Sequence, residues 1–186
     1  MTDLVIFVEE RSAGIVVDVL AARIAPEKTV RVIEHEGKQD LKRSYPKKIN
    51  AWRHPTDVPF LVLHDNDGGD CRSLKAVLLR AVPQTGVSRT KVRLVMQHLE
   101  SWYLGDAPAL VAAGLLTPSR AVTIAGSAKF RDPDLLGNAK LEFHKLHKQT
   151  GQILLARRIA PHLNLDTNRS HSFRLLVSTL RDLLGA

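Results

Sequence analysis

The stretch from Pro59 to Lys75, PFLVLHDNDGGDCRSLK, constrains the fold more than any other part of the sequence. It opens with a short continuous apolar run, which is typical of a strand buried on both faces of a parallel sheet. The run leads into HDNDGGD at residues 64–70, and a segment able to form a helix follows. A buried strand that ends in acidic residues and a glycine turn predicts one strand and helix unit of an α/β protein.

Similar units recur along the first half of the chain. One continuous apolar run ends in Glu9 and Glu10, and a later segment alternates apolar and polar residues. We expect strands at Leu4–Val8, at Val30–Ile33, after Pro59 and at Lys91–Gln97. We expect helices capped by Ser12 and closed before Pro26, from about Gln39 to Trp52 with a disturbance at Pro46, and from about Cys71 to Ala81.

From Ala107 onward the signals are helical, and the last helix is expected from about Ser170 to Leu184 because its apolar residues fall on one face. Strands alternating with helices predict an α/β fold with a mostly parallel four-stranded sheet flanked by helices. We expect a core over residues 1–106 and a helical C-terminal part over residues 107–186. The second part should pack on the core to give a single compact unit.

The charge balance favours a polyanionic partner. Lys and Arg number 27 against 19 Asp and Glu, which gives a formal charge of +8, and nucleic acid is the obvious candidate. The lone Cys71 excludes an internal disulfide, and no apolar run is long enough to span a membrane. The start of the chain lacks the pattern of a signal peptide, so we expect a cytoplasmic protein with no membrane partner.

Acidic residues follow three of the expected strands. Glu9 follows the first, Asp65, Asp67 and Asp70 follow the third, and Glu100 follows the fourth. Ligands of open α/β sheets bind at the carboxyl ends of strands, where these carboxylates should meet. Two carboxylates about 5 Å apart repel by roughly 3 kcal/mol at an effective dielectric constant of 20. The cluster therefore predicts a bound Mg²⁺ or Mn²⁺, with Asp65 and Asp67 on the same side of extended backbone.

The acidic turn at residues 64–70 has other interpretations. Asp65 and Asp70 could cap the turn and the next helix while Asp67 is solvated. A calcium loop of the EF-hand type is excluded because Gly69 and Ala76 stand where that loop needs oxygen ligands. Zinc is disfavoured because Cys71 has no paired ligand at the usual spacing. A phosphoaspartate nucleophile of the haloacid-dehalogenase kind stays open, although that motif usually follows the first strand.

With these residues assembled, the chain resembles the Toprim-like proteins of domain-of-unknown-function family 4276. Several motifs in the same order carry the resemblance, and they run nearly from end to end of the chain. They are Val8-Glu9-Glu10 with Ser12, His35-x-Gly37-Lys38-x-x-Leu41, Asp65-x-Asp67-x-x-Asp70-Cys71-x-x-Leu74-Lys75, Leu99-Glu100-Ser101-Trp102-Tyr103-Leu104-Gly105-Asp106, Lys129-Phe130-Arg131-Asp132-Pro133-Asp134 and Asn168-x-Ser170-x-Ser172-Phe173.

The resemblance implies a Toprim-type fold in which Glu9, Asp65 and Asp67 bind Mg²⁺ for phosphodiester chemistry. Glu100 and Asp70 match the narrower family's own pattern, which assigns them no role. Such proteins often look like partners of ATPases in mobile-element or phage-defence gene clusters. One departure from the pattern is His98, which stands where a Glu is expected.

These observations favour a metal-dependent nuclease or another enzyme that acts on phosphodiesters. Glu9, Asp65 and Asp67 would hold the ion, and Glu100 or Asp70 would assist a second ion or orient water. The basic residues expected to hold the nucleic-acid backbone are Lys38, Lys75 and Lys129. The alternative is a noncatalytic partner or regulatory subunit of an ATPase, whose contact surface would use the aromatic residues Trp52, Trp102 and Tyr103.

Overall fold

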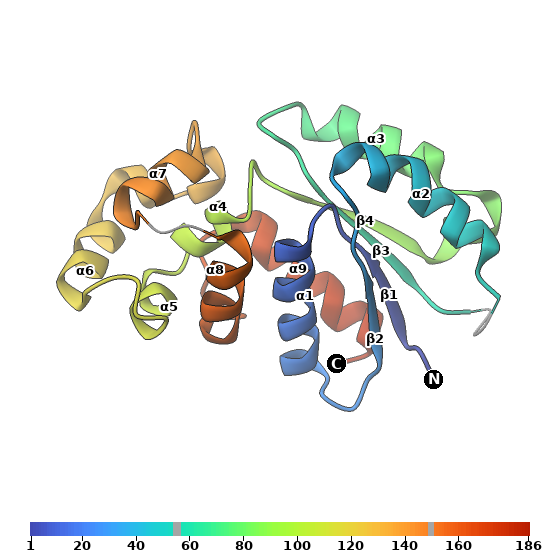
Figure 1. The fold of residues 1–186 in the computed structure, drawn as a ribbon, viewed down its shortest axis with the longest axis horizontal. Helices are drawn as coiled ribbons and strands as arrows, with labels where there is room; N and C mark the ends of the chain where they lie inside the picture. Colours follow the sequence, from blue (N-terminus) through green and yellow to red (C-terminus); the bar gives the residue numbers. More distant parts are fainter. Residues whose placement is uncertain (54–56, 149–150) are drawn as a thin grey trace.

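The computed structural model describes residues 1–53, 57–148 and 151–186, and its centre is a four-stranded parallel sheet (Figure 1). The strand order is β2-β1-β3-β4. The strands are β1 (Leu4–Phe7), β2 (Val30–Ile33), β3 (Phe60–Asp65) and β4 (Thr90–Val95). The predicted four-stranded parallel sheet flanked by helices is confirmed.

The strand bounds differ from expectation mainly at β4. This strand begins at Thr90 and ends at Val95, whereas the alternating pattern predicted a strand to Gln97. The prediction was wrong at this end because Gln97 has a φ angle of 63°, in the left-handed region that a strand cannot contain. The chain therefore turns directly after β4, above the carboxyl end of β3.

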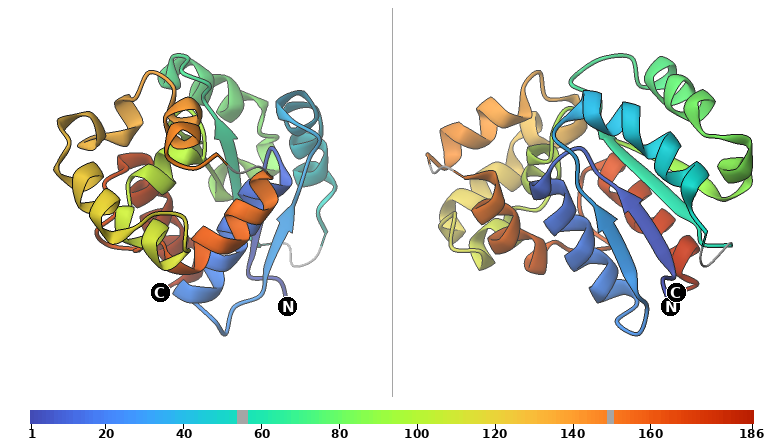
Figure 2. Two further views of the ribbon diagram at one scale, coloured as in Figure 1. Left: turned by 60° about the vertical axis from the view of Figure 1, so that its left-hand side comes forward. Right: turned by 45° about the vertical axis from the view of Figure 1, so that its right-hand side comes forward.

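Alternate residues of the strands face two separate cores. Along β1, Leu4 and Ile6 face α1 (Arg11–Ile24) and α9 (His171–Leu184). Val5 and Phe7 face the opposite side, where α2 (Lys38–Ala51) and α3 (Cys71–Ala81) lie. Figure 2 shows these helix pairs on the two faces of the sheet. The sheet is therefore the middle of three layers, as the continuous apolar runs predicted.

The first two helices differ from the sequence prediction, α1 in its N-terminal cap and α2 in the effect of its proline. Ser12 does not cap α1; the helix begins at Arg11, and the Ser12 hydroxyl donates a hydrogen bond to Glu10 Oε1. Pro46 lies inside α2 without ending it, although its missing N–H costs the helix one backbone hydrogen bond. The helix persists because Tyr45 and Ile49 on its buried face are fully covered.

The second half of the described chain is helical. Its α-helices before α9 are α4 (Glu100–Leu104), α5 (Ala107–Ala112), α6 (Pro118–Gly126), α7 (Ala139–Leu146) and α8 (Gln152–Ile159). Short 3-10 helices lie at Gln84–Arg89, Ala128–Phe130, Pro133–Leu135 and Ala160–His162. The division into a core and an extension at residue 106 stays a prediction. In the parts of the chain described here, no helix is long and apolar enough to cross a membrane.

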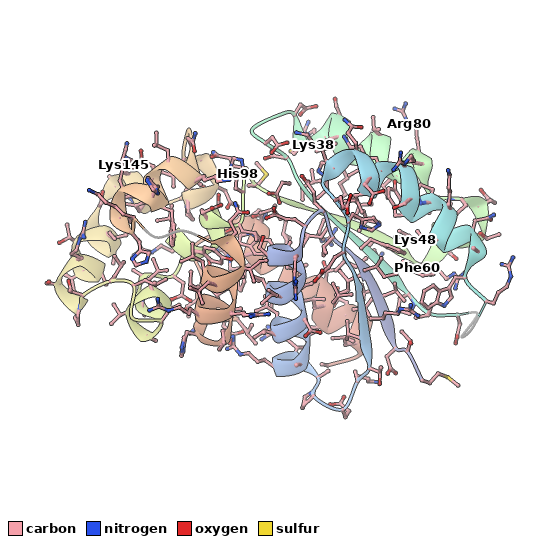
Figure 3. The ribbon with its side chains drawn as sticks, viewed as in Figure 1. Lys38, Lys48, Phe60, Arg80, His98 and Lys145 are labelled. Carbon is pink, nitrogen blue, oxygen red and sulfur yellow. The ribbon has the colours of Figure 1, made fainter. Side chains whose placement is uncertain are left out.

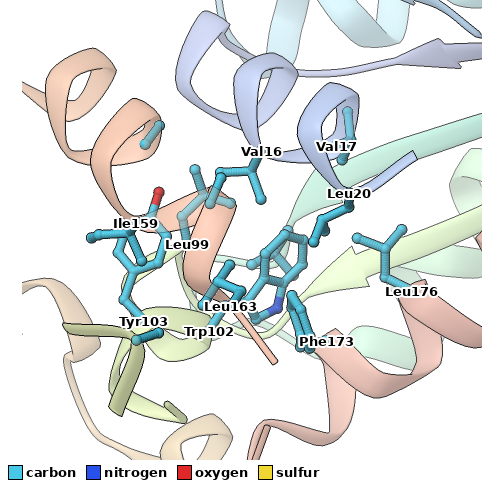
Figure 4. Packing of buried hydrophobic residues seen from close by; sticks show 14 of the residues in the cluster. Val16, Val17, Leu20, Leu99, Trp102, Tyr103, Ile159, Leu163, Phe173 and Leu176 are labelled. Carbon is cyan, nitrogen blue, oxygen red and sulfur yellow. The ribbon is translucent and has the colours of Figure 1, made fainter. Parts of the chain in front are cut away.

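Trp102 is the central apolar residue that joins this helical half to the sheet. It is fully buried, and its ring lies 5.6 Å from that of Phe173 on α9. Figure 4 shows both rings packed among residues of α1, including Leu20. Tyr103 is only 3% exposed. The proposal that Trp102 and Tyr103 form a partner-binding surface was therefore wrong, because both side chains are in the core.

A buried polar network anchors the start of α9. Asp134 accepts hydrogen bonds from Ser170 Oγ and from the Ser172 backbone N–H, both at 2.7 Å. Trp102 Nε1 donates to Ser172 Oγ at 3.0 Å, and Asn168 Nδ2 donates to the Trp102 carbonyl at 2.9 Å. Members of three separate sequence motifs thus meet in one structural network, which fixes α9 against α4.

Loss of the Asp134 carboxylate should destabilise the fold. Asp134→Ala leaves buried donors on Ser170 and Ser172 without an acceptor, and each such group costs about 1–3 kcal/mol. We expect the free energy of unfolding to fall by about 2–3 kcal/mol in urea denaturation. Asp182→Ala, at an exposed position of α9, is the matched control and should change it by less than about 0.5 kcal/mol. Equal effects of the two variants would contradict a structural role for the network.

Candidate functional site

A cavity of about 220 Å³ lies where the carboxyl ends of β1 and β3 meet the start of α4. Its walls come from the sheet edge on one side and from the helices α4, α7 and α8 on the other. The residues that line it are Glu9, Glu10, Ser12, Asp65, Asp67, His98, Leu99, Glu100, Tyr103, Lys140, Gln152 and Leu155. We call this space the acidic cavity, because five of these residues are Asp or Glu.

Glu9 and Glu10 enter the cavity directly after β1. Glu9 Oε2 is buried and has no hydrogen-bond partner within the described residues, and it lies 3.7 Å from His64 Nδ1. His64 Nδ1 also lies 2.5 Å from the Asp65 carbonyl oxygen. Burial lowers the pKa of His64, so the imidazole does not supply a permanent positive charge to balance Glu9.

The turn after β3 brings Asp65 and Asp67 to the same cavity, although not by extended backbone. Asp65 is the last residue of the strand, and Asp67 has a φ angle of 49°, followed by Gly68 at 75°. The expectation of extended geometry between the two acids was wrong for this reason. Asn66 holds the turn, because its Oδ1 accepts hydrogen bonds from the N–H groups of Gly68 at 3.1 Å and of Gln97 at 2.5 Å.

Glu100 and Tyr103 belong to α4 and stand three residues apart, so they share one face of that helix. Glu100 is 6% exposed, and the hydroxyl of Tyr103 is buried without a hydrogen-bond partner among the residues described. Burial, together with the charges of Glu100 and other acids, raises the pKa of Tyr103 well above its ordinary value. Tyr103 therefore presents a neutral hydroxyl that is free to donate a hydrogen bond.

Burial, with carboxylate crowding second to it, dominates the electrostatics of the cavity. Burial raises the pKa of Asp65 well above its ordinary value, and the charges of Glu9, Glu10, Asp67 and Glu100 raise it further. The pKa of Glu9 is raised by burial and then by Asp67. The pKa of Glu100 is raised mainly by burial. The negative charge of the site is thus only partly neutralised by the protein, so the site favours binding of protons or cations.

Basic side chains approach the acids from two sides. Lys38 Nζ at the start of α2 lies 2.6 Å from Asp67 Oδ2, and His98 Nε2 lies 3.7 Å from Asp67 Oδ1. Figure 3 shows Lys38 on α2 and His98 in the loop before α4. Lys140 on α7 lines the opposite wall. Cationic groups therefore border the acids without pairing with all of them.

The structure does not bring the remaining predicted residues to this cavity. Asp70 caps α3, where its carboxylate accepts hydrogen bonds from the Arg72 and Ser73 N–H groups at 3.4 and 2.9 Å. Lys75 lines a separate groove between α3, β4 and α9. Lys129 pairs with Glu142, with Nζ 2.5 Å from Oε2. Their roles in metal or nucleic-acid binding stay predictions, and each has a structural contact elsewhere.

Several cavity residues had not been assigned to the site from the sequence. Lys140 and Gln152 come from α7 and α8, and no pattern in the sequence connects these helices with the strand ends. Tyr103 had a signal, because its spacing of three from Glu100 predicts a shared helix face. Glu10 follows Glu9 directly, and its place in the cavity depends on the turn into α1.

The donor set suits a hard divalent cation. Carboxylate oxygens are the ligands that Mg²⁺ and Mn²⁺ prefer, and Glu9 Oε2 offers one that no group among the described residues satisfies. Over residues 1–53, 57–148 and 151–186, however, no three His, Cys, Asp or Glu side chains stand close enough together to hold an ion as they are. The residues fit the ion chemically, and their side chains would have to rotate toward it.

The burial and crowding of the carboxylates make the free energy of unfolding of the metal-free protein depend on pH. Asp65 has an ordinary pKa of 3.8 and a raised pKa in the folded chain, so the folded state binds more protons between these two values. The stability that protonated Asp65 provides is therefore lost as the pH rises through that window. With EDTA at neutral pH, we expect Asp65→Asn to raise the unfolding free energy by about 1 kcal/mol and the Tm by roughly 2–4 °C.

Asp18→Asn, at an exposed position of α1, is the control for the loss of one negative charge. It should leave the Tm within about 1 °C of the original. A lower Tm for Asp65→Asn than for Asp18→Asn would mean that the Asp65 carboxylate is stabilised as an ion, against the expected direction.

The fold is similar to solved structures of C-terminal regions of OLD proteins. The C-terminal region of the Burkholderia pseudomallei OLD protein matches with a TM-score of 0.58 at 20% identity, covering 99% of each chain. The C-terminal region of the Xanthomonas campestris pv. campestris OLD protein matches with a TM-score of 0.55 at 15% identity, covering 100% of this chain and 97% of the other. These neighbours have the Toprim fold, so the expected Toprim-like fold class is confirmed.

The family follows from the sequence comparison. A search of curated proteins finds no match to this chain. The family model described as "Domain of unknown function (DUF4276)" matches residues 8–181, which is nearly the whole chain and includes every residue of the acidic cavity. The chain belongs to the DUF4276 family.

Proposed function

We propose that this protein is a divalent-cation-dependent enzyme that cleaves phosphodiester bonds in nucleic acid. The observation that carries the proposal is the convergence of Glu9, Asp65, Asp67 and Glu100 on one cavity at the carboxyl ends of parallel strands. Burial raises the pKa of Asp65, and the charges of the neighbouring acids raise it further. A fold does not stabilise itself by such an arrangement, so the cluster is best explained by a cationic ligand.

Glu9, Asp65 and Asp67 would hold Mg²⁺ or Mn²⁺. Such an ion stabilises negative charge on a phosphate under attack and lowers the pKa of bound water. The unpaired Oε2 of Glu9 supports its role as a ligand. Asp65 supports the same role because its raised pKa falls again when positive charge replaces its neighbours' repulsion. We leave Asp70 out of the ligand set because its carboxylate caps α3.

The remaining cavity residues would bind and orient the substrate. Lys38 and Lys140 stand on opposite sides of the acids, where their ammonium groups would contact phosphate oxygens on either side of the cleaved bond. Tyr103 would donate its hydroxyl proton in a hydrogen bond to the substrate or to water, because no acceptor within the described parts of the chain satisfies it. Glu100 would orient water, since burial raises its pKa and makes it a better proton acceptor than an exposed carboxylate.

Nucleic acid is the proposed substrate because the chain carries a formal charge of +8 around a site that suits phosphodiester chemistry. The similar structures are described as C-terminal regions of OLD proteins, so in those proteins the fold is one part of a longer chain. We propose that this chain likewise works with a partner, an ATPase encoded separately, in a mobile-element or phage-defence system.

Cleavage assays test the proposed chemistry. Supercoiled plasmid, single-stranded DNA and RNA are incubated with the protein in Mg²⁺, in Mn²⁺ or in EDTA. We expect cleavage only with a divalent ion, and a loss of at least about 100-fold in Asp67→Asn and Glu9→Gln, because each removes a charge from the ligand set. Asp18→Asn should cleave at the original rate.

Two results would contradict this function. Full activity in both Asp67→Asn and Glu9→Gln would exclude them from the reaction. The second result has two parts: the original protein does not cleave, and Mn²⁺ raises its Tm no more than it raises the Tm of Asp67→Asn. Together they would contradict the proposed metal site. The noncatalytic role as a regulatory subunit of an ATPase would then be the better explanation.

A further inference from the structure

A second cavity, of about 420 Å³, carries three arginines and lies apart from the acidic cavity. Arg131 follows the short helix at Ala128–Phe130, Arg169 precedes α9, and Arg174 is in the first turn of α9. The rest of the wall is the end of α6 and the residue after it, at Ala125, Gly126 and Ser127. We call it the arginine cavity. Among the described residues that line it, none is acidic.

Two of the arginines are held in place by neutral acceptors. Arg169 Nη1 donates to the Ala125 carbonyl at 2.8 Å, and Arg174 Nη1 donates to the Asn168 carbonyl at 2.6 Å. Carbonyl groups fix the position of a guanidinium without cancelling its charge. Each planar fork retains further N–H donors, so less side-chain freedom is lost when an anion binds.

The side chain of the third arginine has no partner in the described parts of the chain. Arg131 is exposed, and its guanidinium makes no hydrogen bond or ion pair there, whereas its backbone N–H donates to the Ala128 carbonyl at 3.3 Å. Elsewhere on the same helical half, Lys129 and Lys145 both contact Glu142, and Arg181 contacts Asp166. The arginine cavity instead gathers three guanidinium groups, and none of them forms an ion pair with a carboxylate of the described residues.

The chemistry of the cavity selects an oxyanion with several acceptor oxygens. A phosphate group accepts paired hydrogen bonds from arginine forks and gains from every uncompensated positive charge nearby. Ser127 adds a hydroxyl to the same wall. A carboxylate ligand has only two oxygens and would satisfy fewer of these donors.

The position of the cavity connects it to the acidic site. Ala125 and Arg169 also line an adjoining hollow whose wall includes Leu104 and Gly105, at the end of α4. The same short helix carries Glu100 and Tyr103 of the acidic cavity. In addition, the Arg169 N–H donates to the Gly105 carbonyl at 2.9 Å. Both sites are therefore connected to α4, one through its residues Glu100 and Tyr103 and the other through Gly105, which follows it.

We propose that the arginine cavity binds a backbone phosphate of the nucleic acid, away from the phosphate at the acidic cavity. The inference rests on the proposed action on nucleic acid, which it extends from a cleavage site to a second contact on the strand. The contact would position the strand and carry no base information, as is usual for arginine bound to phosphate.

Metal-free binding tests this contact separately from cleavage. The anisotropy of a fluorescent single-stranded oligonucleotide is measured in EDTA over a range of salt concentrations. We expect Arg131→Gln to weaken binding about tenfold, the loss of one charge-assisted hydrogen bond. The slope of log Kobs against log salt should become shallower by about 0.7. Because the Arg131 side chain is exposed and without partners in the described chain, the variant should fold normally.

Arg80→Gln is the matched control. Arg80 is an exposed arginine on α3, labelled in Figure 3, and does not line either cavity. Its removal changes the net charge of the protein by the same amount. We expect a change of less than about twofold in affinity. Equal losses in Arg131→Gln and Arg80→Gln would overturn the inference, because they would indicate general charge attraction.

Inorganic phosphate distinguishes the source of the anion. If phosphate raises the Tm of the original protein but not of Arg131→Gln, while oligonucleotide affinity is the same for both, the cavity takes a free phosphate and the inference is overturned. Oligonucleotide binding that depends on Arg131 without any metal-dependent cleavage would support the inference and contradict the proposed enzyme. Metal-dependent cleavage, together with unchanged oligonucleotide binding by Arg131→Gln, would support the proposed enzyme and contradict the inference.

Discussion

The repulsion among carboxylates gathered at the strand ends is the constraint on which the site depends. Asp65 carries most of it, because it ends a central strand and is surrounded by acids from β1, its own turn and α4. Folding has to bring these groups together against their mutual charge. The surrounding structure must therefore supply the stabilisation, and the apolar layers on both faces of the sheet provide it.

The helical half is part of the site and not only a cover for the sheet. Lys140 and Gln152 form a wall of the acidic cavity from α7 and α8, and α4 contributes Glu100. The position of α4 is fixed by Trp102, which is buried between α1 and α9 and hydrogen-bonded to Ser172. The polar network at the start of α9 thereby determines where one of the acids lies.

The sequence predicts the sheet, its parallel order and most helices because each depends on local patterns of apolar residues and turn residues. It also predicts that acids after different strands lie at one edge of the sheet, because the carboxyl ends of parallel strands share that edge. Glu9, Asp65, Asp67 and Glu100 line one cavity there, whereas Asp70 does not. The alternative in which Asp70 caps the next helix is confirmed for that residue, but the sequence does not decide between capping and the cavity, because Asp67 and Asp70 follow the same strand and only Asp67 lines the cavity. The sequence also does not predict the positions of Lys140 and Arg131. Contacts between helices that are far apart in the chain produce no regular residue spacing that could indicate them.

The distribution of charge resolves an apparent conflict between a basic protein and an acidic site. A polyanion is attracted at long range by the net charge of +8, but carboxylates would repel it at the point of reaction. A divalent ion bound in the acidic cavity would reverse that local sign, and the proposed contact at the arginine cavity would hold the strand where none of the described lining residues is acidic. On this proposal, binding of the strand and binding of the metal would be separate events, so affinity without metal and cleavage with metal would report different parts of the same surface.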